Sequence, residues 1–116
     1  MCFVEVDLDE YSKFHREIVY TAKKKHKCCE CWGKIEIGEK YLYETGYLYG
    51  FYQYKTCMSC REVRDLFCCS WYYTDMWSNI MDSINECDVN FGCLDLLSEK
   101  ARNKFIAFYD KYYGDE

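Results

Sequence analysis

The sequence predicts an α+β fold, and three observations lead to this prediction. A segment rich in β-branched and aromatic residues, broken by glycines, extends over 35–56 and is typical of a β-hairpin. Later segments repeat apolar residues at spacings of three and four, which indicates helices. Two Cys-x-x-Cys pairs flank the hairpin. The length of 116 residues suits one domain, so we expect a single domain over 1–116.

Short strands are expected before the hairpin. Residues 3–6 (FVEV) predict one strand, and residues 17–22 (EIVYTA) predict another because they are β-branched and aromatic. The wider segment 12–22 is also compatible with a helix, and the pattern leaves both alternatives open.

The hairpin itself is predicted from two strands and a glycine-rich turn. Its strands are IEIGEKYLYETG (35–46) and FYQYKT (51–56), and between them Gly46 and Gly50 are free to take positive φ. Because strand neighbours alternate faces, both faces should carry aromatic side chains. We expect at least two of the aromatic residues at the tip to be exposed and to contact a partner or a second copy of this chain. These residues are Tyr47, Tyr49, Phe51 and Tyr52.

Three helices are expected after the hairpin. Thr56 is the predicted N-cap of the first, CMSCREVRDLF (57–67), which places Val63, Leu66 and Phe67 on one face. The other two form a C-terminal helical part over about 74–113. The second helix starts near Thr74 and has a stripe of Trp77, Ile80, Met81 and Ile84. The third extends from Leu94 to Tyr112, with a stripe of Leu94, Leu97, Ala101, Phe105, Phe108 and Tyr112. Both stripes are expected to form core.

Four cysteines predict a zinc site. A Cys-x-x-Cys turn supplies two soft ligands for a tetrahedral metal, and the hairpin brings the second pair to the first. The second pair lies at a predicted helix N-terminus, where backbone N–H groups stabilise thiolate charge. We therefore expect one structural Zn²⁺ on Cys28, Cys31, Cys57 and Cys60. The predicted fold is a small zinc-stapled, treble-clef-like hairpin plus helix over about 20–68, followed by two further helices.

The remaining cysteines and histidines are assigned other roles. Cys29 lies too close to Cys31 for the usual knuckle, and His26 is expected at the surface or beside the site, because four cysteines already fill it. Four further cysteines have spacings that fit no standard knuckle and are expected to be buried thiols, with a second metal left open. They are Cys68, Cys69, Cys87 and Cys93.

The segment KKKHKCCECWGKIEIGEKYLYETGYLYGFYQYKTCMSCREVRDLF resembles a family of small, uncharacterised phage and prophage proteins. The shared features are His-x-Cys, Cys-x-x-Cys, Ile-x-x-Gly-Glu-x-Tyr and Lys-Thr-Cys-x-x-Cys, and they fall at 26–31, 35–41 and 55–60, with Arg64 after them. FGCLDLLSE also resembles that family, with Cys93 where glycine is usual. The resemblance covers about 20–100 and departs from the family at Tyr49-Gly50. It implies the same zinc ligands and a viral origin, and it implies no activity.

Enzymatic function is not expected. Four thiolates close the coordination shell, whereas a catalytic zinc keeps a position open. A His-Asn-His nuclease needs a histidine in the hairpin, but both histidines, His15 and His26, precede the first ligand. A thioredoxin-like protein keeps a cis-proline beside its dithiol, and this chain has no proline.

The N-terminus and the hydropathy pattern predict a cytoplasmic protein, in the host cell if the chain is phage-encoded. MCFVEVDLDE is acidic and does not resemble a signal peptide. Cys-x-x-Cys spacing suits a metal in a reducing compartment better than a disulfide framework. No apolar run approaches the length of a membrane span.

Charge and aromatic content bear on the partner. Residues 13–64 carry 11 Lys/Arg against 6 Asp/Glu, and the rest carries 4 against 14. Acidic flanks and surplus tyrosine suit a protein interface, so we expect a protein-interaction module that binds a host or phage protein, or forms a homodimer. Its expected action is inhibition of a host enzyme or of a host defence complex, and an anti-CRISPR protein is one example of such an inhibitor. The alternative is nucleic-acid binding through a basic group. That group comprises Lys23, Lys24, Lys25, Lys27, Arg61 and Arg64.

Overall fold

The computed structural model describes residues 14–47, 50–68, 71–86 and 91–113. The chain forms two compact units, which we describe separately as the β-unit, whose described residues end at Met58, and the helical unit, whose described residues begin at Ser59. The prediction of a single domain over 1–116 stays a prediction.

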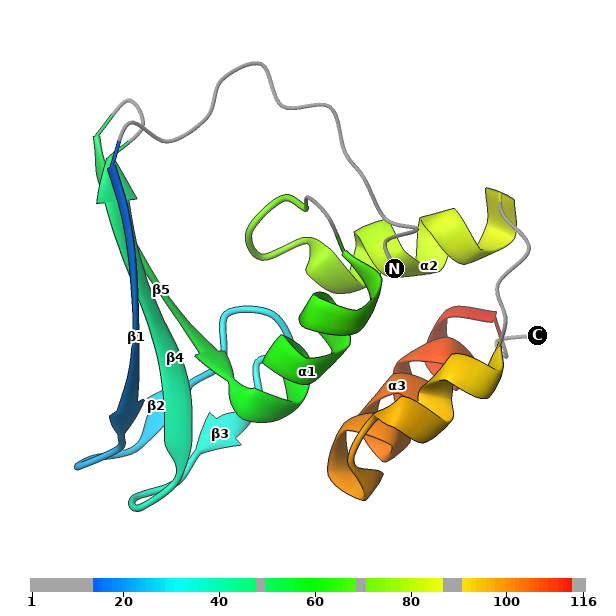
Figure 1. Ribbon diagram of the computed structural model, residues 1–116, viewed down its shortest axis with the longest axis horizontal. Helices are drawn as coiled ribbons and strands as arrows, with labels where there is room; N and C mark the ends of the chain where they lie inside the picture. The colour runs from blue at the N-terminus through cyan, green and yellow to red at the C-terminus, as the bar shows by residue number, and fades with distance from the viewer. Residues whose placement is uncertain (1–13, 48–49, 69–70, 87–90, 114–116) are drawn as a thin grey trace. The chain divides into compact units, whose positions relative to one another are not determined.

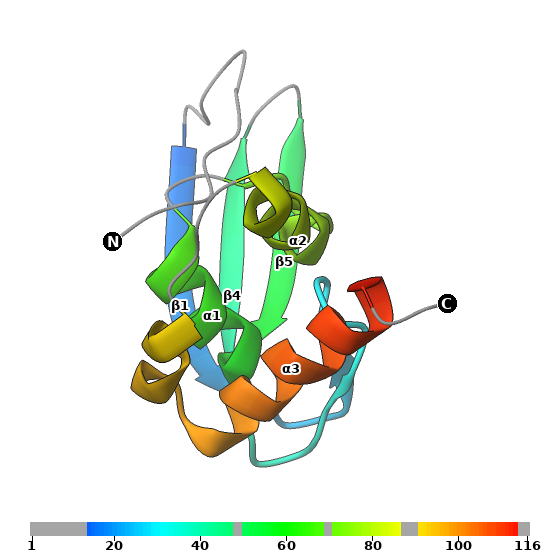
Figure 2. The ribbon, with the colours of Figure 1, turned by 90° about the vertical axis from the view of Figure 1, so that its right-hand side faces the viewer.

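The β-unit is built on an antiparallel sheet of three strands in the order β1–β4–β5 (Figure 1). They are β1 (Phe14–Thr21), β4 (Lys40–Tyr47) and β5 (Phe51–Cys57). The same three strands lie side by side in the orthogonal view (Figure 2). A second, small sheet pairs β2 (His26–Lys27) with β3 (Lys34–Ile35). The predicted hairpin is therefore confirmed, and the ambiguous segment 12–22 is a strand from Phe14 to Thr21.

The register of the three strands defines two faces. Directly opposed residues in antiparallel strands share a face. Glu44 is opposed by Glu17 on β1 and by Tyr54 on β5, so these residues define the Glu44 face. Tyr41 is opposed by Tyr20, and the strand register places six aromatic residues on this other face, the tyrosine face. These are Phe14, Tyr20, Tyr41, Tyr43, Tyr47 and Phe51.

Two glycines have positive φ where the chain turns. Gly50, just before β5, has φ 142°, as expected, and Gly38 has φ 91°. Gly38 lies in the turn after β3, where the Glu39 N–H donates to the Glu36 carbonyl at 3.0 Å. The expectation for Gly46 was wrong, because β4 continues to Tyr47 and Gly46 lies inside it, opposite His15 and Tyr52.

The helical unit contains α1 (Met58–Phe67, which begins one residue before the division), α2 (Met76–Glu86), the 3₁₀ helix η1 (Phe91–Leu96) and α3 (Glu99–Tyr113). Its core is aromatic. The Phe67 and Phe105 rings lie 5.3 Å apart, and Trp77 stacks on Phe108 at 4.2 Å. Further buried apolar residues complete the core: Val63, Met76, Ile80, Met81, Leu97 and Ala101. The predicted stripes therefore pack inward at most of their positions.

Two helix boundaries differ from the prediction. Thr56 is not the N-cap of α1, because β5 continues through Cys57 and α1 begins at Met58. The predicted third helix is two elements, and Leu94 lies in η1 rather than in α3. Ser98 separates them, since its Oγ accepts a hydrogen bond from the Ala101 N–H at 3.3 Å and so caps α3.

The fold class is confirmed as α+β, with a hairpin followed by the helix α1 and then by two further helices. Within the described segments, none of the helices is both long enough and apolar enough to cross a membrane. The strand predicted at 3–6 lies outside the described residues.

Candidate metal centre

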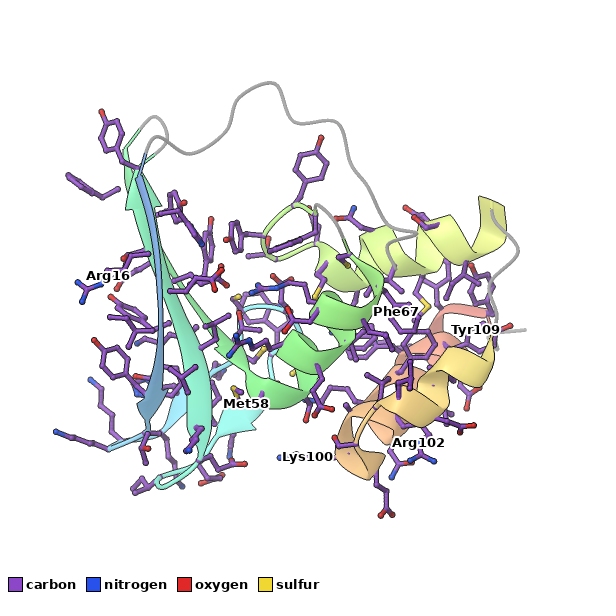
Figure 3. The ribbon with its side chains drawn as sticks, viewed as in Figure 1. Arg16, Met58, Phe67, Lys100, Arg102 and Tyr109 are labelled. Atoms are coloured by element: carbon purple, nitrogen blue, oxygen red, sulfur yellow. The ribbon has the colours of Figure 1, made fainter. Side chains whose placement is uncertain are left out.

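The four cysteines of the two Cys-x-x-Cys pairs lie together. The sulfur atoms of Cys28, Cys31, Cys57 and Cys60 are all within 4.8 Å of one another. Cys28 follows β2, Cys31 ends the turn after it, Cys57 is the last residue of β5, and Cys60 lies in the first turn of α1. Figure 3 labels Met58, the residue after Cys57, at the point where β5 becomes α1. This arrangement is compatible with a metal site.

Backbone hydrogen bonds shape the first pair into a knuckle. The Trp32 N–H donates to the Cys28 carbonyl at 3.0 Å, and the Cys28 N–H donates to the Gly33 carbonyl at 2.9 Å. Trp32 takes φ 60°, which returns the chain on itself. The Cys29 N–H donates to the Lys55 carbonyl of β5 at 2.8 Å. The knuckle is thereby joined to the strand that carries Cys57.

N–H groups donate to the sulfurs of Cys28, Cys31 and Cys60. Cys28 Sγ accepts from the backbone N–H groups of Glu30 at 3.4 Å and of Cys57 at 3.3 Å. Cys31 Sγ accepts from the Gly33 N–H at 3.4 Å. Cys60 Sγ accepts from the indole Nε1–H of Trp77 at 3.3 Å. Donors to sulfur favour its anionic form, which is the form that binds metal.

Two of the sulfurs are fully buried. Cys28 and Cys60 are 0% exposed, whereas Cys31 and Cys57 are half-buried. Gly33 adds a close approach, because a Cβ built there would lie 3.2 Å from Cys31 Sγ. A side chain at this position would therefore require the Cys31 sulfur to shift by a few tenths of an ångström.

Cys29 is in a different environment from its four neighbours. Its sulfur lies 3.6 Å from Thr56 Oγ1 and 3.7 Å from Glu30 Oε2. Burial raises the pKa of the Cys29 thiol to about 11, and the Thr56 hydrogen bond opposes this only in part. A thiol that holds its proton is a poor metal ligand. Cys29 therefore differs in charge state from a metal-binding thiolate, whereas its short spacing to Cys31 was the reason to exclude it from the predicted ligands.

His26 contacts the sheet rather than the sulfurs. Its Nδ1 lies 3.2 Å from Lys55 Nζ, and its ring is 5.0 Å from that of Tyr41. Burial lowers the pKa of His26, and the charges of Lys55 and Lys24 lower it further. The clustered sulfur group does not include His26.

The predicted aromatic tip is divided between the two faces. Phe51 is 87% exposed and Tyr47 is 40% exposed, and their rings meet edge to face at 5.1 Å. Tyr52 lies on the Glu44 face, is half-buried, and its hydroxyl is 3.0 Å from His15 Nδ1. Tyr49 lies outside the described residues. Two of the four side chains are thus exposed as expected, and Tyr52 does not share their surface.

The predicted basic group is also divided. Lys23, Lys24, Lys25 and Lys27 are exposed. Arg64, by contrast, is 3% exposed, and its guanidinium carbon lies 4.3 Å over the ring of Trp71. Arg64 is therefore part of the packing of the helical unit, and its expected place in a basic surface was wrong. Among the other cysteines, Cys68 is buried, while Cys69, Cys87 and the side chain of Cys93 lie outside the described residues.

Two features of this region were missed in the sequence. The Trp77 indole donor comes from α2, 17 residues after Cys60, and no local pattern connects the two. His15, Glu17 and Glu44 form a second cluster of potential metal ligands. The alternation His-x-Glu within a strand places His15 and Glu17 on one face, but their proximity to Glu44 depends on the register.

Comparison of the chain with protein-family models, with curated proteins and with solved structures finds no match.

Proposed function

We propose that the four clustered cysteines hold one structural Zn²⁺. The observation that carries this proposal is the set of four sulfurs within 4.8 Å. Zinc accepts four thiolates in a tetrahedron, and such a shell leaves no position for water. The N–H donors to Cys28, Cys31 and Cys60 offset part of the negative charge of the thiolates. The ion would connect the knuckle to the start of α1, and no catalytic role is proposed for it.

Metal analysis of matched cysteine variants tests the zinc proposal. Purified protein should contain about one zinc per chain, and Cys31→Ser or Cys57→Ser should lose it and unfold, since structural zinc contributes on the order of 10 kcal/mol in small fingers. Cys29→Ser is the control, because that thiol keeps its proton, and it should retain zinc. Metal-free protein with an unchanged melting curve would contradict the proposal, as would zinc loss in Cys29→Ser.

We further propose that the chain is a protein-interaction module that acts through the exposed pair Tyr47 and Phe51 at the end of the hairpin. A phenylalanine with 87% of its surface exposed gains free energy when a partner covers it, and aromatic residues dominate the binding energy of interfaces. The resemblance to phage proteins favours a host or phage protein as the partner, in the cytoplasm of the host. Inhibition of a host enzyme or of a defence complex such as CRISPR is the role that this setting favours.

Capture of partners from host lysate tests the interaction. Wild-type protein should retain a defined partner, and Phe51→Ala should lose most of it. Ile37→Ala is a matched control, because Ile37 is also highly exposed (65%) but lies in the turn at the other end of β4. If Phe51→Ala and the wild type retain the partner equally, the hairpin tip is not the binding surface. Sedimentation of the purified chain distinguishes a second copy from a foreign partner.

One observation favours a second candidate, binding of single-stranded nucleic acid. Among the described residues of the tyrosine face, none is acidic, and Arg16 and Lys55 are basic. Figure 3 shows Arg16 pointing away from the sheet. Exposed tyrosines on a sheet stack with bases, and basic side chains pair with phosphates. The salt dependence discussed below separates this candidate from protein binding.

A further inference from the structure

The Glu44 face carries a group of three potential ligands that the zinc proposal does not use. His15 and Glu17 lie on β1, and Glu44 lies opposite Glu17 on β4. One ligand atom from each, the imidazole nitrogen and two carboxylate oxygens, lies within 4.8 Å of the others. All three residues belong to the β-unit, so the strand register alone brings them together.

The distances in this group suit direct coordination. His15 Nε2 is 3.3 Å from Glu17 Oε1 and 3.3 Å from Glu44 Oε2. Ligand atoms about 2.1 Å from a metal lie about 3.0 Å apart at a right angle and about 3.4 Å apart in a tetrahedron. The two measured separations fall between these values, so one ion would reach all three ligands with small side-chain movements.

Tyr52 holds the imidazole in the orientation that such a site needs. Its hydroxyl lies 3.0 Å from His15 Nδ1. When Nδ1 carries the proton and donates a hydrogen bond to this hydroxyl, Nε2 presents its lone pair to the two carboxylates. Metal-binding histidines generally have such a partner on the second ring nitrogen. Tyr52 is therefore a positioning residue for His15.

Burial separates this group from ordinary surface carboxylates. The side chain of Glu44 is 0% exposed, while His15 and Glu17 are 33% and 47% exposed. The group therefore combines one buried carboxylate with two partly exposed side chains.

We propose that His15, Glu17 and Glu44 form a second metal site, for a divalent transition-metal ion. Imidazole favours zinc, cobalt, nickel and iron over calcium and magnesium, which prefer oxygen ligands alone. One nitrogen and two oxygens are only three protein ligands. The remaining coordination positions are therefore open to water or to an anionic group of a ligand.

Cobalt titration of the zinc-loaded protein tests the site. Zinc binds more tightly than cobalt to a given set of ligands, so zinc release is measured in the same sample to confirm that the cysteines keep their ion. Calorimetry should show uptake of about one Co²⁺ per chain. His15→Gln and Glu17→Gln should each weaken this uptake by roughly tenfold or more, and Tyr52→Phe should weaken it less. Glu17 is the most exposed of the three ligands, so its substitution leaves the fold intact.

The matched controls are the other histidine and an exposed glutamate. His26→Gln and Glu36→Gln remove the same chemical groups outside the cluster and should bind Co²⁺ as the wild type does. The competing explanation is that protonated His15 is simply the counterion of Glu44. In that case no saturable Co²⁺ uptake appears, and the proposal is overturned. The proposal is also overturned if His15→Gln still takes up Co²⁺, or if His26→Gln abolishes Co²⁺ uptake as His15→Gln does.

Discussion

At the scale of single residues, the space beside a ligand sulfur limits which residue can follow Trp32. A Cβ on Gly33 would lie 3.2 Å from Cys31 Sγ, closer than an ordinary van der Waals contact. A sulfur held by a metal has little freedom to move away. We expect Gly33→Ala to speed zinc transfer to a chelator by roughly tenfold, a typical effect of disturbing the surroundings of a metal ligand.

A substitution at the preceding residue is the control for this prediction. Trp32 has φ 60° and is largely exposed. Glycine adopts positive φ at no steric cost, so Trp32→Gly should retain zinc as the wild type does. Chelator competition that shows the same zinc release for Gly33→Ala and wild type would contradict the argument from space.

The sequence could predict the cysteine cluster but not its surroundings. The spacing of Cys28, Cys31, Cys57 and Cys60 is typical of tetrahedral metal sites, and these four sulfurs do lie together. The donor Trp77 could not be predicted, because its indole reaches Cys60 through the packing of α2. The cluster of His15 with Glu44 depends on the strand pairing that places Glu17 opposite Glu44, 27 residues later, and only the register fixes that pairing.

At the scale of elements, Ser98 determines where α3 begins. Its Oγ accepts from the Ala101 N–H, and its N–H and hydroxyl donate to the Glu62 carboxylate of α1 at 2.9 and 2.7 Å. Loss of an N-cap costs about 1 kcal/mol, and hydrogen bonds to a charged group add to this. Ser98→Ala should therefore lower the free energy of unfolding by about 1–2 kcal/mol in denaturant titration.

Ser78→Ala is the matched control for the cap. Ser78 is an exposed residue inside α2, where alanine has the higher helix propensity, so its substitution should be neutral or slightly stabilising. Equal stability of the two variants would show that Ser98 is not a cap. The break at Ser98 also explains why the sequence predicted a single third helix. Leu94, Leu97 and Ala101 keep a helical spacing across the break, and spacing alone does not detect a cap.

A second contact between elements, from α3 to α2, predicts that the stability of the fold depends on pH. The Tyr112 hydroxyl donates to Asp82, and this hydrogen bond, with burial and the charge of Asp82, raises the pKa of Tyr112 above its ordinary value of 10.0. The folded state therefore holds the proton more tightly than the unfolded state. The contribution of the Tyr112–Asp82 hydrogen bond to stability is fully present below pH 10 and is lost as pH rises through the raised pKa of Tyr112.

Stability measured across the alkaline range checks this contact. Wild-type stability should fall more steeply above pH 10.0 than that of Tyr112→Phe, which has no proton to lose. Asp82→Asn should flatten the slope in the same way, and the double variant should add nothing further, because both changes remove one interaction. Parallel slopes in all four proteins would show that the pair does not form in solution.

At the scale of the whole molecule, charge is divided along the sequence, and this division bears on the partner. Residues 13–64 carry an excess of five positive charges, and the remainder carries an excess of ten negative charges. This contrast was readable from the sequence. The placement of Arg16, Lys55 and the tyrosines on a single sheet face was not, because it depends on strand register. Whole-chain charge and local surface thus favour different partners.

Salt dependence separates the two partner classes. The acidic segments repel phosphates that come within the Debye length, about 8 Å at physiological salt, so we expect no tight binding to duplex DNA at about 0.15 M salt. If single-stranded nucleic acid is the partner, binding should weaken steeply with salt, because phosphate contacts release counterions. Replacement of Lys23, Lys24, Lys25 and Lys27 by Gln should then abolish it, and Tyr43→Ala should weaken it through lost stacking.

If a protein is the partner, the same lysine changes should matter little, and Phe51→Ala should act mainly by raising the dissociation rate. Tyr43→Ala separates the two cases, because Tyr43 lies on the tyrosine face but is not one of the tip pair, Tyr47 and Phe51. Its hydroxyl donates to Gln53 Oε1 at 2.6 Å. Gel shifts and surface-binding kinetics on the same variants measure both outcomes. A reproducible dissociation constant below about 1 μM for random duplex DNA at about 0.15 M salt would reverse the ranking, since non-specific contacts are weak under that condition.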